Sequence, residues 1–202
     1  MKKVILKFSI IIIMLAIGCS GKLSAQFEQK ITLQASAGMT IAQGPESLLD
    51  IFHNLGYSID AGIQYNFSRR TAIVAMAKYS TFLDMPDPHA ILDELHFNLL
   101  GINLCPKLRF LPHRRFNPYI YGGASVNYIS ITHGFAGEEP VTSTSPVSIG
   151  LIAGAGADLR LNDNIALFTQ GGFNNVDQGK VWIDSFFFQL GVNINMFKAR
   201  TL

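Results

Sequence analysis

The stretch FFFQLGVNINMF, residues 186–197, alternates between two kinds of side chain. Every second residue is apolar, in the order Phe186, Phe188, Leu190, Val192, Ile194 and Met196. The residues between them are polar or small after one aromatic: Phe187, Gln189, Gly191, Asn193 and Asn195. Because side chains alternate across a β-strand, this stretch has one apolar face and one polar face. A soluble sheet buries the apolar face, whereas a membrane barrel turns it toward lipid.

Seven further stretches show the same period of two, and the sequence predicts no long helix after residue 25. These predicted strands are residues 30–41, 57–67, 71–82, 95–110, 118–132, 146–161 and 165–173. The stretch 71–82 is apolar on both faces, so its phase stays open. A tilted strand that spans a membrane needs about 9–11 residues, and all eight stretches are about that long or longer. Eight is also the smallest usual strand number for a bacterial outer-membrane barrel.

The connections between the predicted strands alternate in length and charge. Four long, mostly acidic loops are expected at residues 42–56, 83–94, 133–146 and 174–182. Two of the shorter turns contain the basic pairs Arg69–Arg70 and Arg114–Arg115. Outer-membrane barrels have long extracellular loops and short periplasmic turns. We therefore expect the four acidic loops to face outward and these arginines to face the periplasm.

The first 25 residues predict an export signal. Lys2, Lys3 and Lys7 precede an apolar run of about 11 residues, which is too short for the roughly 20-residue helix that spans a bilayer. Cleavage after Ala25 would leave a barrel domain at residues 26–202. Lipidation at Cys19 stays open as an alternative, because the surrounding AIGCS loosely resembles a lipoprotein cleavage box.

Removing this signal changes the charge balance. The whole chain carries +2, but four of its 16 Lys and Arg precede residue 26, which leaves 12 against 14 Asp and Glu, a balance of −2. No basic patch remains, so no nucleic-acid partner is expected. The one cysteine after Ala25, Cys105, cannot form an internal disulfide and is expected as buried filler. The five histidines, His53, His89, His96, His113 and His133, lack metal-site spacing, so no metal or cofactor is expected.

The non-aliphatic rows of the predicted strands indicate which way the apolar rows point. They contain mainly Gly, Ser, Asn and Gln with few charges, whereas the water-facing rows of a soluble lipocalin-like barrel normally carry many charged residues. Such rows suit the narrow, side-chain-filled interior of an eight-stranded barrel. We therefore expect a plugged interior rather than an open pore. Its charged, hydrogen-bonded network should include Asp60, Lys107, Arg109, Asp158 and Arg160.

The predicted fold class is all-β: a monomeric, eight-stranded, antiparallel, up-and-down transmembrane β-barrel after a cleaved signal peptide. The barrel must be closed, because an unpaired backbone edge in hydrocarbon costs several kcal/mol. The signal, the eight strands and the loop alternation together resemble the OmpX/OmpA-like small outer-membrane barrels. The SAQ cleavage context and Gly-rich strands look like the outer-membrane β-barrel family common in Bacteroidetes.

This resemblance implies an outer-membrane location and contact with lipid and lipopolysaccharide. The terminal strand also resembles the signal read by the barrel-assembly machinery, through Gln189, Gly191, Ile194, Met196 and Phe197. The expected function is structural or surface-interacting, with the acidic loops contacting an extracellular partner.

Two alternatives stay open. One is a lipid-modifying, deacylase-like enzyme, which would need a serine, a histidine and a carboxylate at the outer rim. Its candidate residues are His133, Ser143 or Ser145, and Glu138 or Glu139. The other is a soluble, ligand-binding, lipocalin-like barrel.

Overall fold

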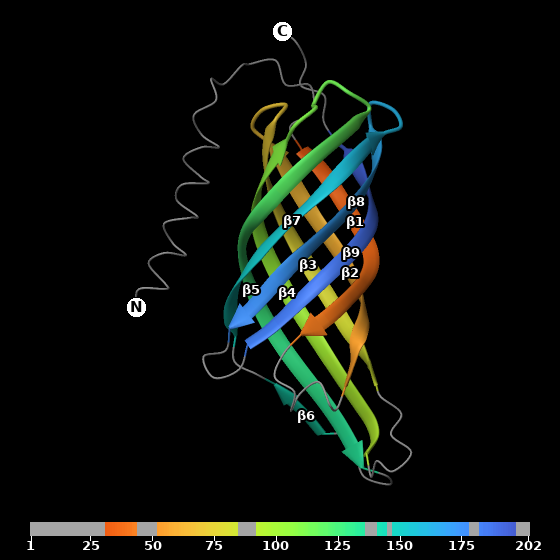
Figure 1. Ribbon diagram of the computed structural model, residues 1–202, viewed down its shortest axis with the longest axis vertical. Helices are drawn as coiled ribbons and strands as arrows, with labels where there is room; N and C mark the ends of the chain where they lie inside the picture. The colour runs from red at the N-terminus through yellow and green to blue at the C-terminus, as the bar shows by residue number, and fades with distance from the viewer. Residues whose placement is uncertain are drawn as a thin grey trace, which may run out of the picture.

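A computed structural model describes residues 31–43, 52–84, 92–135, 141–144, 147–177 and 182–196. They form nine strands (Figure 1): β1 (Ile31–Gln43), β2 (Phe52–Asn66), β3 (Thr71–Asp84), β4 (Leu92–Arg109), β5 (Phe116–Phe135), β6 (Val141–Thr144), β7 (Ser148–Arg160), β8 (Ile165–Asp177) and β9 (Trp182–Asn195). Within these ranges, no helix is long and apolar enough to cross a membrane. The predicted signal peptide lies outside the described residues.

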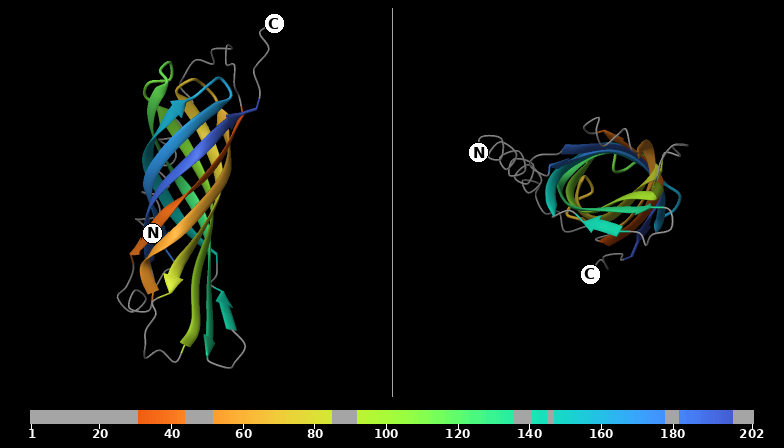
Figure 2. Two further views of the ribbon diagram at one scale, coloured as in Figure 1. Left: turned by 90° about the vertical axis from the view of Figure 1, so that its right-hand side faces the viewer. Right: turned by 90° about the horizontal axis from the view of Figure 1, so that it is seen from below.

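Eight of the strands close into a barrel, which Figure 2 shows end-on as a ring. Each pairs antiparallel with its neighbour, and β1 pairs with β9 to close the ring, so that Leu33 lies opposite Ile194. The short β6 pairs with β5 outside this ring. The predicted closed, eight-stranded, up-and-down barrel is confirmed. Closure gives each of the eight barrel strands two partners, as a sheet in hydrocarbon requires.

Several strands run further than the sequence predicts. β2 begins at Phe52 instead of residue 57, and β5 continues to Phe135 instead of ending at residue 132. β8 likewise continues to Asp177 instead of residue 173, and β9 begins at Trp182 instead of residue 186. The long loop expected at 174–182 is therefore wrong: the β8–β9 connection has only the four residues 178–181, no more than the turn at residues 67–70. The reason is physical: outward positions near these strand ends, such as Asn175 opposite Asp184, are polar, so the apolar alternation by which a strand is recognised is lost.

The terminal strand settles the direction of the apolar rows. Phe188 and Leu190 are 58% and 62% exposed, whereas Gln189 is fully buried and Asn193 is 5% exposed. Polar side chains therefore fill the interior and apolar ones cover the outside. A soluble lipocalin-like barrel requires the opposite arrangement. Such a large apolar exterior marks a surface that is covered by lipid.

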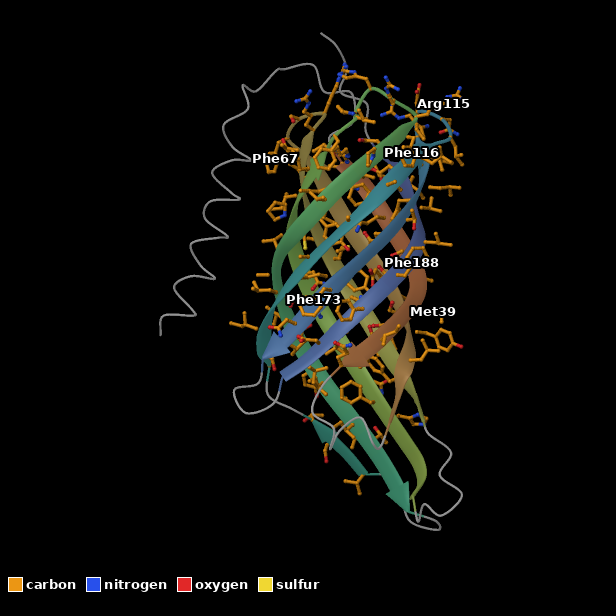
Figure 3. All side chains as sticks on the ribbon, in the orientation of Figure 1. Met39, Phe67, Arg115, Phe116, Phe173 and Phe188 are labelled. Carbon is orange, nitrogen blue, oxygen red and sulfur yellow. The ribbon has the colours of Figure 1, made fainter. Side chains whose placement is uncertain are left out.

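Aromatic side chains mark the two borders of this apolar exterior. At the short-turn end the exposed aromatics are Tyr65, Phe67, Phe110 and Phe116. Toward the long-loop end they are Tyr57, Tyr79, Tyr128, Phe186 and Phe188. Figure 3 shows Phe67 and Phe116 near one end of the barrel and Phe173 and Phe188 well below them. Along β2, the eight residue steps from Tyr57 to Tyr65 span about 27 Å, or about 21 Å after strand tilt, close to the roughly 25 Å apolar band of membrane barrels.

The structure also gives the phase of β3, which the sequence left open. Val74, Met76, Lys78 and Phe82 are buried inside the barrel, whereas Tyr79 is exposed outside. The interior face of β3 is thus mainly apolar, in contrast to the interior faces of β1 and β2. This strand contributes to the apolar layers of the lumen described below.

Candidate functional site

A charged cluster lies inside the barrel toward the short-turn end. Asp158 on β7 accepts from the ammonium of Lys107 on β4, with Nζ 3.3 Å from Oδ2. Arg109 Nε lies 3.6 Å from the same oxygen, and Asn193 Nδ2 donates to Oδ1 at 3.0 Å. Lys107 also lies over the Tyr119 ring, 3.5 Å from its centroid. One buried carboxylate therefore faces two cations, a pairing that buried charges need.

A second charged pair lies deeper in the lumen. Asp60 on β2 is opposite Lys78 on β3, and both residues are buried. Ser36 donates to Asp60 Oδ2 at 3.5 Å, whereas Asp60 Oδ1 and Lys78 Nζ have no hydrogen-bond partner. The Lys78 ammonium instead lies 3.3 Å from the centroid of the Phe187 ring, a cation–π contact.

Sequence reasoning missed Lys78, because the phase of its strand was open. A signal was nevertheless present in the turn at residues 67–70. In an antiparallel hairpin, residues at equal distances from the turn lie opposite each other. Asn66 therefore pairs with Ala72, and six residues further along each strand Asp60 pairs with Lys78. The turn therefore specifies the partner once the inward direction of Asp60 is accepted.

Amide and hydroxyl side chains connect the strands around the rest of the interior. Gln170 donates to Gln189 at 2.8 Å, and Gln189 donates to Ser58 at 3.0 Å, which links β8, β9 and β2. Further round the wall, Ser125 donates to Asn174 at 3.0 Å. These buried hydrogen bonds hold polar groups that would otherwise be costly to bury.

Two apolar clusters also occupy the interior, which the sequence did not predict. The first lies near the strand ends that meet the long loops and draws on β1, β3, β4, β5, β8 and β9. Its buried members are Ala42, Phe82, Phe97, Leu99, Ile129, Val176 and Ile183. The second cluster comprises Val74, Met76, Cys105, Tyr119, Tyr121, Ile152 and Phe187. Cys105 is fully buried there as a free thiol, in the filler role predicted for it.

Arg160 differs from the other four residues of the predicted interior network. It is the last residue of β7 and is exposed, at the short-turn mouth of the barrel. It lines a cavity there together with Arg109 and Asp158. Asp60, Lys107 and Asp158 are buried in the lumen, and Arg109 is partly buried between lumen and mouth.

At the opposite end, β4 and β5 extend beyond the barrel (Figures 1 and 2). There β5 pairs on one side with β4 and on the other with β6, from Ser130 opposite Thr144 to His133 opposite Val141. All four β6 residues are exposed. Within the described ranges β6 pairs only with β5, so its outer edge has no strand partner. We call this three-stranded extension of β4, β5 and β6 the projecting sheet.

The residues of the expected assembly signal lie on both faces of β9. Gln189 and Gly191 face the interior, whereas Ile194 and Met196 face outward and are 45% and 50% exposed. Phe197 lies outside the described residues. The structure thus presents two apolar residues of this set to lipid near the end of the terminal strand.

The residues suggested for a deacylase-like enzyme are only partly described. Ser143 lies on β6 opposite Ile131, and the backbone of His133 pairs with Val141. Ser145, Glu138 and Glu139 lie outside the described residues. In the described part of the chain, no three His, Cys, Asp or Glu side chains converge as a metal site.

No protein-family model and no curated protein sequence matches the chain. Solved structures do match. Neisserial surface protein A is similar over 82% of this chain and 97% of its own, with 19% identity and a TM-score of 0.64. A major outer membrane protein from Thermus thermophilus covers 82% and 99%, with 12% identity and a TM-score of 0.58. Ail, the attachment invasion locus protein of Yersinia pestis, solved with the heparin analogue sucrose octasulfate, covers 83% and 100%, with 9% identity and a TM-score of 0.56.

The chain has the fold of the small, OmpX/OmpA-like outer-membrane β-barrels. At these identities the likeness concerns the fold. The apolar exterior between two aromatic borders is an independent physical reason for a membrane location, because exposure of so large an apolar surface to water is unfavourable. Fold and exterior together place the protein in the outer membrane.

Proposed function

We propose that this protein is a non-enzymatic surface-interaction barrel of the type common in Bacteroidetes, with a plugged lumen and a contact surface on its extracellular side. The observation that carries the proposal is the projecting sheet. β5 runs on to Phe135, beyond its last pair with β7 at Asn127, and there it supports β6. A rigid sheet held beyond the membrane surface is suited to contact with another molecule.

The lumen layers support a plug. The charged cluster around Asp158, the pair Asp60 and Lys78, and two apolar clusters all lie inside one eight-stranded ring. An eight-stranded barrel is only just wide enough for its own side chains. Ion passage would require moving aromatic residues such as Phe82 and Phe97, whose rings pack 5.2 Å apart.

The free edge of β6 indicates how a partner would bind. An unpaired strand edge offers backbone N–H and C=O groups to an extended peptide, which adds to the sheet as a further strand. β6 carries Val141, Thr142, Ser143 and Thr144, with no charge to repel an incoming strand. The nearby loop sequence is acidic, with Glu138 and Glu139, so a neutral or cationic peptide fits better than a polyanion of the kind bound to Ail.

This function can be tested by selecting peptides from a display library for binding to the barrel held in nanodiscs. We expect enriched peptides with β-propensity, and we expect binding to be lost when Thr142→Pro and Ser143→Pro are combined, because proline removes backbone donors from β6. The matched control combines Thr142→Ala with Ser143→Ala and should retain binding. Absence of any enriched peptide, or equal binding to the proline variant, would contradict the proposal.

A further inference from the structure

The short-turn mouth of the barrel contains a cavity of about 310 Å³ at the end opposite the projecting sheet. It lies inside the ring of strands and between the turns that connect them. Its charged lining residues are Arg69, Arg109, Arg114, Arg115, Arg160, Asp158 and Asp163, with His113 beside them. Figure 3 shows Arg115 at this end of the molecule.

The charges of the cavity are strongly unequal. Five arginines face two aspartates, and one of these, Asp158, is already held by Lys107 and Arg109 within the lumen. The remaining cationic excess is gathered on one concave surface. A concave site lined by one sign of charge concentrates the field and attracts a counter-ion.

Part of this basic surface is held in place. Arg69, in the β2–β3 turn, donates through Nη1 to Nδ1 of His113 in the β4–β5 turn at 3.1 Å. At the inner end, Arg109 Nη2 donates to Asn66 Oδ1 at 3.0 Å. These contacts position guanidinium groups from the β2–β3 turn and from the end of β4 around one space. Guanidinium groups held in this way match the oxygens of phosphate by paired hydrogen bonds.

Unpartnered polar atoms lie in the wall of the same cavity. Gln64 and Asn193 line it and are 1% and 5% exposed, yet Oε1 of Gln64 and Oδ1 of Asn193 have no hydrogen-bond partner. Their other amide ends are occupied, since Gln64 donates to Asn66 at 2.9 Å and Asn193 donates to Asp158. Buried amide oxygens without partners are costly, and a bound molecule with hydroxyl groups would satisfy them.

We propose that this cavity binds a small phosphate monoester that carries hydroxyl groups. Two negative charges complement the cationic excess, the hydroxyl groups complement the amide side chains of the wall, and the volume exceeds that of a single inorganic ion. By the general topology of outer-membrane barrels, the short turns face the periplasm, so the site takes its ligand from that side. The site does not depend on the projecting sheet, so the two proposals can fail separately.

Isothermal titration of the folded barrel with glycerol 3-phosphate tests the site. In uncharged detergent micelles we expect one molecule bound per barrel. Arg69→Gln and Arg160→Gln should each weaken binding about tenfold, because each removes a charged hydrogen-bond donor. Arg70→Gln is the matched control: it removes the same charge from the same turn, but Arg70 does not line the cavity. Its affinity should stay within about twofold.

A mobility shift on heating confirms that each variant is folded before titration. No binding by the wild-type barrel, or equal losses in Arg69→Gln and Arg70→Gln, would overturn the proposal. Equal competition by a polyglutamate peptide would also overturn it, because that result indicates general attraction to anions. Repeating the titration in nanodiscs identifies the source of the phosphate. Phosphatidic acid is used because its headgroup is a phosphate monoester. Binding that survives in phosphatidic acid nanodiscs indicates a soluble phosphate ester. Competition by this lipid that Arg69→Gln abolishes and Arg70→Gln leaves unchanged indicates a lipid headgroup.

Discussion

The ammonium of Lys78 lies 3.3 Å from the centroid of the Phe187 ring, while the backbone of Lys78 pairs with that of Asp60 on the neighbouring strand. One buried cation is therefore stabilised by an aromatic face and by a carboxylate from another strand. Both the lysine and the aspartate are buried in the lumen, where water cannot stabilise their charges. Removing either charged residue leaves the other buried charge without an opposite charge beside it.

Replacing Lys78 by methionine should destabilise the barrel by about 3 kcal/mol or more, because the buried Asp60 carboxylate then has no opposite charge beside it. Urea unfolding in detergent measures this change. The double variant with Asp60→Asn should recover most of the loss, since no charge is then buried without a partner. A double variant that is no more stable than Lys78→Met would show that the two charges are not coupled.

Asp158, in the charged cluster near the short-turn end, and Arg160, at the mouth itself, should respond differently to substitution. Asp158→Asn leaves Lys107 and Arg109 as close like charges, so we expect a loss of about 3 kcal/mol in unfolding free energy. Arg160 was expected in the same plug, but it is exposed at the mouth. Arg160→Leu should therefore change the unfolding free energy by less than about 0.5 kcal/mol. A large loss for Arg160→Leu would place this residue in the buried network after all.

Gly171 and Gly172 are neighbours that should differ sharply in tolerance of a methyl group. A Cβ on Gly172 would lie 2.6 Å from the Ala153 carbonyl oxygen and 2.7 Å from the Phe187 ring, whereas the nearest atom to a Cβ on Gly171 is 3.5 Å away. Gly172→Ala should lower the unfolding free energy by about 1–3 kcal/mol, and Gly171→Ala should be nearly neutral. Equal effects of the two substitutions would contradict the packing around Phe187.

Planar-bilayer recordings should show no large, steady conductance for the wild-type barrel. The reason is the apolar cluster that includes Phe82 and Phe97, together with the charged layers between it and the short-turn end. A matched recording from an established open porin controls for insertion. A stable ohmic current from this protein at low voltage would refute the plugged lumen.

Epitope tags on intact cells test the orientation. A tag near Glu138 should be labelled from outside, and a tag near Arg114 should be labelled only after the outer membrane is made permeable. The expectation follows from the projecting sheet at one end and the short turns at the other. Labelling at Arg114 alone would invert the topology and remove the basis for a partner on β6.

Much of this architecture could be predicted from alternation alone. The outward row of β9, the inward positions of Asp60, Lys107 and Asp158, and the number of barrel strands all follow from a period of two. The phase of β3 could not, because Val74 and Met76 make its interior face as apolar as its exterior face. The two apolar clusters in the lumen could not be predicted either. Alternation separates the two faces of a strand, but it does not show that apolar side chains from different strands gather inside the barrel.

The projecting sheet and the cavity at the short-turn mouth could not be predicted from the sequence for other reasons. β6 is only four residues long, and it was included in an expected loop because it lies where both faces are wet. The cavity brings together Arg69, Arg114 and Arg160 from three separate connections or strand ends. Only the closed ring makes them neighbours, so their sequence positions carry no sign of a shared site.

The seam between β1 and β9 limits when the protein can enter its membrane. It joins strands at opposite ends of the described chain, as in the hydrogen bond from Thr32 to Asn195. Until β9 has arrived, the edge of β1 has no partner, and a partly synthesised sheet would expose that edge to hydrocarbon. Strand-by-strand insertion during translation is therefore unfavourable. The ring can close only once β9 is present, so until that moment the apolar rows of all eight barrel strands must be shielded from water by other means.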